Sequence, residues 1–513
     1  MKRLIVSALL IILLLPVIQP TKAATGDGSW LKTATMYSIF VRSYRDTDGD
    51  GVGDLKGIIE QLDYIQSLGV DTLFLLPVFK AASYHGYDTT DYYTVSPDYG
   101  TNDDLIQLAQ EVHKRGMHLI LDYVLNHTSN QHPYFIDALG NPSSQYSDYY
   151  EWTDDAHTKY KGFANLGFMP TLNYDSPKVV QMALDIATYW MDPNKDGDFS
   201  DGVDGWRVDV AIEIPHRYFR EMRKTMNALN PNAIMLFELF TGDASKMKPF
   251  LKGDEANAAF DFPSAVQLDG NFETNGDGLI NGQGDVRALR TVMLAVQNIF
   301  CAECVAVRFI NNHDTNRIAS DVNGDPARLK MAAVWLLTAP GASVIYYGEE
   351  IGMQGTKGTG PLYDEYRREP FDWYASMTGS EMTSWFKDAK MNNAANDGIS
   401  VEEEDGKADS LLTLYRQLGE LRHTPVFTAG SADTPKLGEA LYLSRRWDAD
   451  TLVLTVINFN TTDQTFTLDP AMMLPKDTSF DLSKAEELFS QGLSGDATLT
   501  LAPAGYAVYR VGK

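Results

Sequence analysis

Cysteine and basic residues are scarce in this sequence. Its 513 residues include two cysteines, and 43 lysines and arginines stand against 69 aspartates and glutamates, which gives a net charge of −26 at pH 7. Two cysteines exclude a disulfide-dense scaffold, and one CxxC pair, Cys301 and Cys304, does not indicate a zinc or redox centre without further partners. A polyanion is a poor partner for nucleic acid or an anionic membrane surface. We therefore expect no nucleic-acid partner, and whether the two cysteines are joined stays open.

Long apolar runs are also missing beyond the start of the chain. Residues 4–17 are apolar except for one serine, follow a lysine and an arginine, and precede a pair of alanines. This pattern is typical of a cleavable signal peptide, and it is too short for a membrane-spanning helix, which needs about 18 to 20 apolar residues. We expect a signal peptide over residues 1–24 and a secreted or periplasmic mature protein with no membrane span. The sequence does not determine the oligomeric state.

The rest of the chain alternates between strand-like and helix-like stretches. Eight short runs are apolar and rich in β-branched or aromatic residues, and segments of helical periodicity separate them. The runs are TMYSIFVRSY, TLFLLPVF, HLILDYVLNH, GWRVDV, AIMLFEL, AAFDF, VAVRFINN and ASVIYYG. Eight strand–helix units fit a parallel (β/α)8 barrel better than an open sheet. We therefore expect an α/β fold with a TIM barrel over residues 25–425.

Two regions depart from this alternation. Residues 128–175 separate the third strand from its helix and are rich in tyrosine, so they are too long for a simple loop and predict a folded excursion. From about residue 426 the strand-like runs LYLSRRW, TLVLTVINF and YAVYRV follow one another without long helices. This change predicts a C-terminal antiparallel β-sandwich domain over residues 426–513.

Charged side chains recur where the expected strands end. The C-terminal ends of the strands build the active site in a parallel barrel. In GWRVDV, Arg207 and Asp209 lie two residues apart and therefore on one face of the strand. Burying these two charges costs free energy unless they are paired or have a function. Four strand ends carry such residues: Asp122 and His127, Arg207 and Asp209, Glu238, and His313 and Asp314. Acidic residues at the same end of four strands indicate a catalytic rim rather than core structure alone.

Clustered carboxylates suit glycoside hydrolysis. This reaction needs one carboxylate as nucleophile and one protonated acid that releases the leaving oxygen. Arg207 beside Asp209 would hold that aspartate ionised, and apolar neighbours would raise the pKa of Glu238 towards the acid role. The pattern therefore predicts Asp209 as the nucleophile and Glu238 as the acid.

At this point the motifs resemble a known family. DYVLNH, GWRVDVA, FELF and FINNHD are similar to the four signature regions of the α-amylase family, glycoside hydrolase family 13, and MPTLN, SYHGYDTTDYY and YYGEEIGM are similar to three further segments. The resemblance covers nearly all of the chain after the apolar start, including the excursion and the C-terminal domain. It implies Asp209 as nucleophile, Glu238 as general acid/base and Asp314 as the carboxylate that stabilises the transition state.

The resemblance also implies a substrate and the residues that bind it. Tyr87 resembles the residue that stacks under the cleaved glucose, and the implied binding set is Tyr87, Asp122, His127, Arg207, His313, Asp364 and Arg368. The implied activity is an exported retaining hydrolase that cleaves α-1,4-glucosidic bonds in starch, maltodextrins or related α-glucans.

Three alternatives stay open. GWRVDVAIE together with MPTLN is closer to neopullulanases and cyclomaltodextrinases, which also transfer glycosyl groups. An isomerase or transglycosidase would use the same three acids, although the expected signal peptide counts against it. A non-catalytic glucan-binding barrel is disfavoured because all three acids are present.

Two acidic runs resemble metal-binding loops. In DTDGDGVGD, oxygen ligands at even spacing suit calcium, and some family members hold calcium here; the expected ligands are Asp46, Asp48, Asp50, the Val52 carbonyl and Asp54. An EF-hand would have a glutamate at Gly57, so the motif is incomplete. DPNKDGDFSD is a weaker version with Asp192, Asn194, Asp196 and Asp198, for which a solvated acidic turn is the competing interpretation. We expect one structural Ca²⁺ and no organic cofactor.

Overall fold

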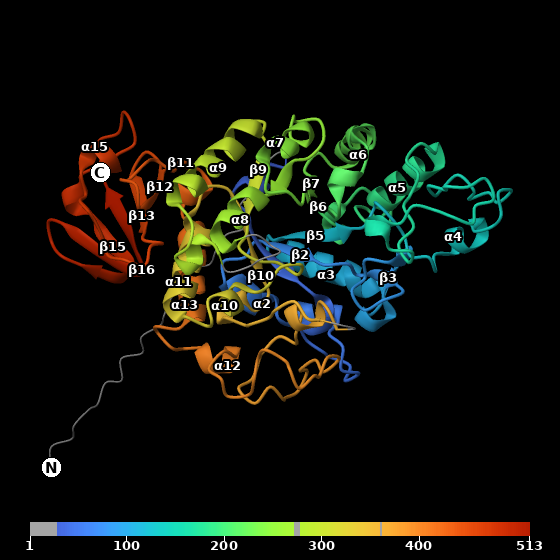
Figure 1. The fold of residues 1–513 in the computed structure, drawn as a ribbon, viewed down its shortest axis with the longest axis horizontal. Helices are drawn as coiled ribbons and strands as arrows, with labels where there is room; N and C mark the ends of the chain where they lie inside the picture. The colour runs from blue at the N-terminus through green and yellow to red at the C-terminus, as the bar shows by residue number, and fades with distance from the viewer. Residues whose placement is uncertain (1–27, 271–276, 360–361) are drawn as a thin grey trace, which may run out of the picture.

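The computed structural model describes residues 28–270, 277–359 and 362–513. The expected signal peptide, residues 1–24, lies outside these ranges. A central barrel carries the excursion with α4 (Pro133–Ala138) on one side and the C-terminal sheet on the other (Figure 1). No helix within the described ranges is long and apolar enough to cross a membrane.

Eight parallel strands close into a barrel in the order β1-β10-β9-β8-β7-β6-β5-β2. The strands are β1 (Thr35–Ile39), β2 (Thr72–Leu75), β5 (His118–Tyr123), β6 (Gly205–Val208), β7 (Ile234–Phe237), β8 (Ala258–Phe260), β9 (Val305–Arg308) and β10 (Ala342–Tyr346). Each lies within one of the eight predicted runs, so the predicted barrel is confirmed. Nearly all their residues are buried because side chains fill the interior and helices cover the outside.

The longer helices alternate with these strands along the chain. They are α1 (Leu55–Glu60), α2 (Leu62–Ser67), α3 (Asn102–Lys114), α5 (Pro177–Tyr189), α6 (His216–Leu229), α8 (Phe262–Asp269), α9 (Val286–Ile299), α11 (Pro326–Thr338) and α13 (Leu411–Arg422). Four-residue helices are α7 (Ala244–Met247), α10 (Ile318–Asp321), α12 (Val401–Glu404), α14 (Pro425–Thr428) and α15 (Pro470–Met473). Sequence signals fix several ends: α3 begins with a capping box of Thr101 and Asp104, and α5 and α11 begin with proline.

The excursion is a small folded unit that is tied back to the barrel. An aromatic core around Phe135 includes the rings of Tyr150, Trp152 and Tyr160. An isolated bridge between His127 and Thr171 joins its base to the end of β5. The sheet of β3 (Phe79–Ala81) and β4 (Thr89–Val95) follows β2 and bonds to the same base. The excursion therefore holds His127 in a fixed position.

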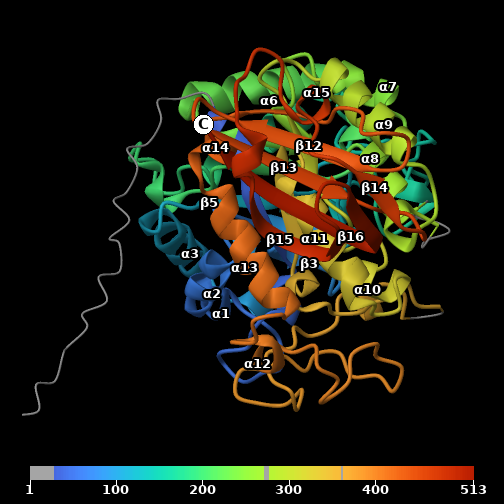
Figure 2. The ribbon, with the colours of Figure 1, turned by 90° about the vertical axis from the view of Figure 1, so that its left-hand side faces the viewer.

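The C-terminal domain is antiparallel, as expected, but its strands form one sheet instead of two facing sheets (Figure 2). The strands are β11 (Ser431–Asp433), β12 (Tyr442–Trp447), β13 (Thr451–Ile457), β14 (Gln464–Phe466), β15 (Glu486–Ser494) and β16 (Leu499–Gly512). One apolar face packs on the barrel, while the other forms a second core with Met473 and Phe480. The region between β14 and β15 contains prolines and turns, so α15 and loops take the place of a second sheet.

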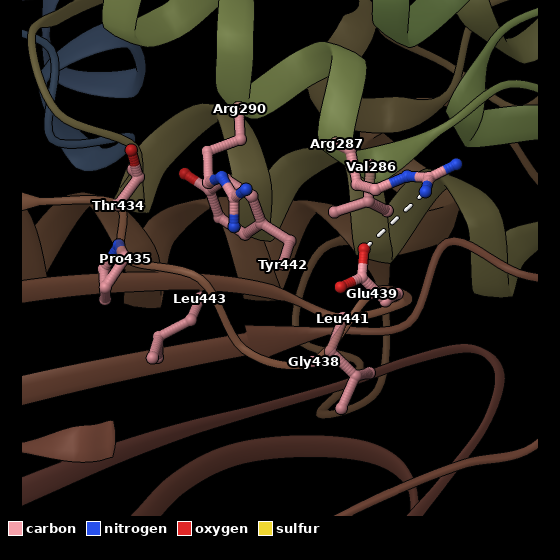
Figure 3. A pocket seen from close by; sticks show the side chains of 10 residues that line it. All are labelled: Val286, Arg287, Arg290, Thr434, Pro435, Gly438, Glu439, Leu441, Tyr442 and Leu443. Atoms are coloured by element: carbon pink, nitrogen blue, oxygen red, sulfur yellow. Dashed lines mark ion pairs between the residues drawn. The ribbon is translucent and has the colours of Figure 1, made fainter. Parts of the chain in front are cut away.

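Polar contacts and a crevice mark the junction of the two domains. Arg446 donates to the carbonyl oxygens of Thr338 and Ala339 at the end of α11. The crevice lies between α9 and the segment that precedes β12, and an ion pair of 3.7 Å between Arg287 and Glu439 crosses it (Figure 3). Its lining contains one carboxylate, so it offers no acid–base pair.

The two cysteines are joined. Cys301 and Cys304 form a disulfide in the loop between α9 and β9, which settles the question that the sequence left open. They lie beside the backbone of Leu251 and Ala256, so the bond braces a loop of the barrel.

Candidate active site

A buried arginine joins three carboxylates at the C-terminal ends of three neighbouring strands. Arg207 on β6 is 1% exposed. Its Nη1 donates to both oxygens of Asp122 at 2.7 Å and to Oδ1 of Asp209 at 2.8 Å, and its Nη2 lies 2.8 Å from Oε1 of Glu238. The strand register brings them together, because Asp122 on β5 pairs with Arg207 and Leu236 of β7 is its other neighbour.

One positive charge divided among three carboxylates does not neutralise them. Burial raises the pKa of Asp209 well above its usual range, and the lowering effect of Arg207 is smaller. Burial likewise raises the pKa of Glu238 against the effect of Arg207. The prediction for Glu238 agrees with this, while the prediction that Arg207 beside Asp209 holds that aspartate ionised does not, because burial outweighs the guanidinium group. The two groups titrate as a pair that holds a proton at higher pH than isolated carboxyls do.

The apolar surroundings that the sequence predicted around Glu238 are present. A small cavity beneath the rim is lined by Glu238 and Arg207 together with the rings of Phe260, Phe262 and Phe309. These rings exclude water from one side of the carboxyl group, which explains why burial dominates its pKa.

The backbone after Asp209 is bent so that it holds Glu238. Val210 lies in the left-handed region with φ 46° and ψ 39°, which is rare for a β-branched residue. The bend aims the amide of Val210 at Oε2 of Glu238 (2.9 Å), and the amide of Ala211 donates to the Glu238 carbonyl (3.1 Å). Because Arg207 holds the other carboxylate oxygen, Glu238 is fixed on both sides.

The third predicted acid is held ionised. Asp314 lies 3.1 Å from Nε2 of His313 and 3.2 Å from Nη2 of Arg368. Burial would raise the pKa of Asp314, but the nearby His313 and Arg368 outweigh it and hold that pKa well below its usual range. Asp364 contacts both Arg367 and Arg368, so the predicted pair Asp364 and Arg368 joins the same cluster.

Tyr87 connects the two acidic groups. Its hydroxyl donates to Oδ2 of Asp122 (2.9 Å) and lies 2.5 Å from Nε2 of His313, whose ring stacks parallel to it. His127 lies 3.0 Å through its Nε2 from the Tyr87 carbonyl, and burial lowers the pKa of His127 to about 4. His127 is therefore neutral at pH 7 and donates to that carbonyl, so it positions Tyr87 without adding charge.

All ten catalytic and binding residues predicted at the rim lie in this one network or in direct contact with it. Sequence reasoning missed three residues. Phe163 stacks on His127 at 4.9 Å, but it lies in the excursion outside any motif. Arg367 contacts the Asp314 carbonyl and directly precedes Arg368 of the predicted binding set. The pair of adjacent arginines in the sequence could have indicated it. Nothing in the sequence marks Val210 as bent.

Several large apolar side chains are exposed, and two of them lie close in sequence to predicted site residues. Phe240 follows Glu238 by two residues and is 47% exposed, and Tyr363 precedes Asp364 and is 48% exposed. Leu166 and Phe168 of the excursion are also exposed. Large exposed apolar groups beside a polar site are typical of ligand contacts.

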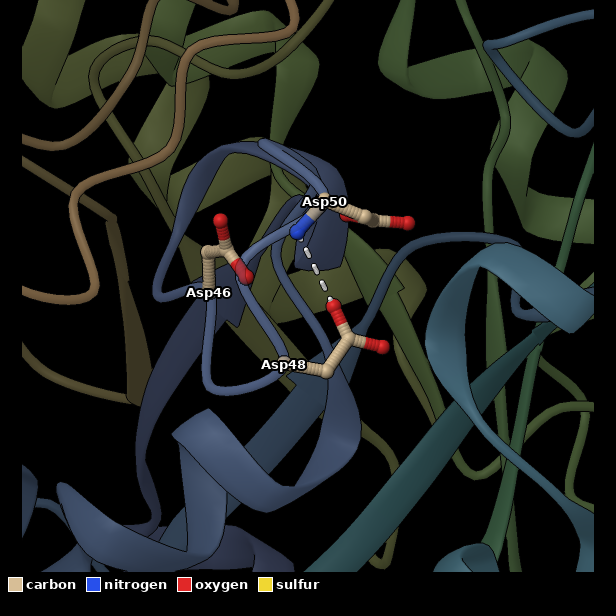
Figure 4. Close-up of side chains that lie close together, drawn as sticks. All are labelled: Asp46, Asp48 and Asp50. Carbon is tan, nitrogen blue, oxygen red and sulfur yellow. Dashed lines mark hydrogen bonds between the residues drawn. The ribbon is translucent and has the colours of Figure 1, made fainter.

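The first acidic loop gathers three of its predicted ligands (Figure 4). Asp46, Asp48 and Asp50 each place a carboxylate oxygen within 4.8 Å of the others. Asp46 is buried, and its oxygens accept the amides of Gly49 and Gly51, which curls the loop. Hard oxygen donors around one point fit calcium.

The other two predicted ligands of this loop differ in what the structure shows. Asp54 caps α1 at Gly57 and also accepts from Thr47, so its carboxylate already has partners. The amide of Val52 donates to Asp50, and the role of its carbonyl stays a prediction.

Comparison with known proteins agrees with this geometry. The alpha-amylase catalytic domain model matches residues 38–430. Alpha-amylase 3 of Dictyoglomus thermophilum is 33% identical over 457 residues, which cover 85% of this chain and 87% of that protein. Neopullulanase 2 of Thermoactinomyces vulgaris is 31% identical and the cyclomaltodextrinase of Thermoanaerobacter pseudethanolicus 33% identical, each over 71% of this chain. The chain spans 66% and 59% of the length of these two relatives.

Solved structures share the whole architecture. An α-amylase from H. orenii superposes with a TM-score of 0.76 at 30% identity, covering 94% of this chain and all of that one. An isomaltulose synthase from Erwinia rhapontici superposes equally well, with a TM-score of 0.77, but at 24% identity it shows the fold alone. The family match, these relatives and the three acids around Arg207 lead to one conclusion: the chain belongs to the α-amylase family, glycoside hydrolase family 13, and is an O-glycosyl hydrolase.

Proposed function

We propose that this protein is an exported retaining hydrolase of α-1,4-glucosidic bonds in starch, maltodextrins or related α-glucans. The observation that carries the proposal is the contact of Asp209 and Glu238 with one guanidinium group. Two carboxylates that share one planar cation lie close together, as in enzymes whose second carboxylate attacks the sugar directly. Export rests on the sequence pattern of residues 1–24.

The geometry supports a two-step reaction. In the first step, Asp209 forms a bond to the anomeric carbon while the glycosidic bond breaks, and Glu238 gives its proton to the leaving oxygen. In the second step, Glu238 takes a proton from water, the water oxygen bonds to the anomeric carbon, and Asp209 leaves. A proton held by the Asp209–Glu238 pair would provide the required starting state, with Asp209 ionised and Glu238 protonated.

The surroundings of the acids support a carbohydrate chain as substrate. The exposed side chains of Phe240, Tyr363 and Phe168 offer apolar surfaces for further sugar rings, while Asp314 and Arg368 offer hydrogen bonds to hydroxyl groups. The clustering of all three acids argues against a non-catalytic barrel.

A cyclomaltodextrinase or neopullulanase type with transglycosylation is the second candidate. The MPTLN segment favours it because this segment resembles its counterpart in those enzymes. Thr171 in this segment pairs with His127, which belongs to the predicted binding set. Relatives with these names match over 71% of this chain.

A product time course on soluble starch, γ-cyclodextrin, pullulan and maltotriose tests the proposal. We expect a rapid loss of starch viscosity with mixed oligosaccharides early in the reaction. Faster attack on γ-cyclodextrin and pullulan than on starch would instead establish the second candidate. No release of reducing sugar from any of the four would contradict both.

Replacing the acids should separate chemistry from binding. Asp209→Asn removes the nucleophile, and we expect kcat to fall by about 10³-fold or more while maltooligosaccharide binding, measured by calorimetry, survives. Glu238→Gln should lower kcat by about 10²- to 10⁴-fold, less so on substrates with good leaving groups that need no proton. Glu221→Gln, an exposed glutamate on α6, is the matched control. Turnover of Asp209→Asn at the wild-type rate would contradict the assignment.

The pH profile should respond to Asp122. Asp209 attacks only when ionised, so activity is lost as pH falls through its pKa. The charge of Asp122 raises the pKa of Asp209, and Asp122 also occupies Arg207. Asp122→Asn should therefore lower the pKa of Asp209 and shift the acid limb of kcat/KM to lower pH. Asp103→Asn, at an exposed site on α3, should leave that limb in place. An acid limb of kcat/KM that stays in place or moves to higher pH in Asp122→Asn would count against this coupling.

We also propose that the loop of residues 46–54 binds a structural Ca²⁺, as its three grouped carboxylates support. A ligand that binds only the folded state stabilises it, so EDTA should lower the melting temperature by a few degrees and added Ca²⁺ should restore it. Asp50→Asn should melt lower than wild type in Ca²⁺ and respond less to EDTA. Equal melting curves for wild type and Asp50→Asn in both conditions would reject a site in this loop.

A further inference from the structure

The second acidic loop, residues 192–201, connects α5 to β6. It has the same internal pattern as the first. Asp192 is buried, and its two oxygens accept the amides of Asp196 (3.2 Å) and Gly197 (3.1 Å). Gly197 has φ 81°, the left-handed conformation that the sixth position of a calcium loop requires. Gly51, at the sixth position of the first loop, has φ 93° and bonds to Asp46 in the same way.

The side chain of Asp201 indicates that a ligand binds in this loop. It is 7% exposed, and its Oδ1 has no hydrogen-bond partner. Its other oxygen accepts from Nδ2 of Asn194 at 2.7 Å, and the same Nδ2 donates to Asp196 at 3.0 Å. Nδ2 of Asn194 therefore lies between the carboxylates of Asp196 and Asp201.

The charges around Asp201 make this arrangement unfavourable for the apoprotein. Asp201 is buried in a loop that also carries the carboxylates of Asp192, Asp196 and Asp198. A buried carboxylate oxygen without a partner costs free energy, and nearby negative charges increase that cost. A cation bound to the unpartnered oxygen of Asp201 would remove both penalties.

We propose that residues 192–201 bind a second structural calcium ion. Its ligands are side-chain oxygens of Asp192, Asn194, Asp196 and Asp201 and the carbonyl oxygen of Asp198. Asp201 supplies the acidic ligand late in the loop, which the EF-hand pattern sought at Val203. Several hard oxygens on a flexible loop suit Ca²⁺ better than Mg²⁺, which requires a stricter octahedron and retains water.

The position of this loop predicts what the ion does. The loop leads into β6, which carries Arg207, and it precedes the strand, so it lies at the N-terminal end of the barrel. His113 on α3 lies 2.8 Å from the Ser200 carbonyl and 2.8 Å from Asp204, which fastens the loop to the barrel wall. In parallel barrels this end serves stability while the opposite end serves catalysis. The ion thus anchors β6 without taking part in the reaction.

Counting bound calcium tests the proposal. The full-length mature protein is stripped with EDTA, dialysed against Ca²⁺ and analysed for metal content, with titration calorimetry for affinity. We expect Asp196→Asn and Asp201→Asn each to bind one equivalent less than wild type, or to bind that equivalent at least tenfold more weakly. Asp198→Asn is the matched control, because it removes a charge from the same loop but keeps the carbonyl ligand, and it should retain the full count.

The variant Asp50→Asn separates the two loops. Whether or not the first loop binds, Asp50→Asn should keep the equivalent that Asp201→Asn loses. Asp196 is exposed, so its variant will report on binding even if Asp201→Asn does not fold. Equal calcium counts in wild type, Asp196→Asn and Asp201→Asn, or an equal loss in Asp198→Asn, would overturn the proposal. The count does not depend on glycosidase activity, so it can fail while the proposed function stands.

Discussion

The buried guanidinium of Arg207 is the group on which the geometry of the site depends. It collects carboxylates from β5, β6 and β7, and removing any one strand from register would leave an unpaired charge in the barrel interior. Its single charge is less than the cluster needs, so the acids compete for it and for a proton. In the proposed mechanism this incomplete neutralisation leaves one of the two acids ionised and the other protonated. The bent backbone at Val210 holds one carboxylate oxygen of Glu238.

Two segments far from the catalytic strands hold this cluster closed. Tyr87 follows β2 and bridges Asp122 to His313, while His127 fixes the Tyr87 carbonyl and is itself covered by Phe163 from the excursion. The network around Asp122 and His313 thus depends partly on segments outside the barrel strands. This division lets loops change substrate preference while the strands keep the chemistry.

The barrel and its rim could be predicted from the sequence because both follow from local patterns. Short apolar runs give strands, and a charge at a strand end, such as Asp209 or Glu238, has to face the rim. The protonation states of the acids could not be predicted from the sequence. They depend on how many carboxylates contact Arg207 and on rings such as Phe260, which lie elsewhere in the chain. The prediction of a second sheet was wrong for a similar reason: alternation in β12, β13 and β16 predicts a covered face but does not show whether strands or loops cover it.

The strongly acidic composition has a structural consequence beyond solubility. A chain with a net charge of −26 is destabilised by self-repulsion, and most of its carboxylates relieve this by facing water. The two acidic loops do the opposite, since Asp46 and Asp192 are buried and turn their oxygens inward onto backbone amides. Neutral amides satisfy hydrogen bonds but leave the charge in place. The same acidity that makes the chain a poor partner for polyanions thus supports the proposal that these sharp turns bind calcium.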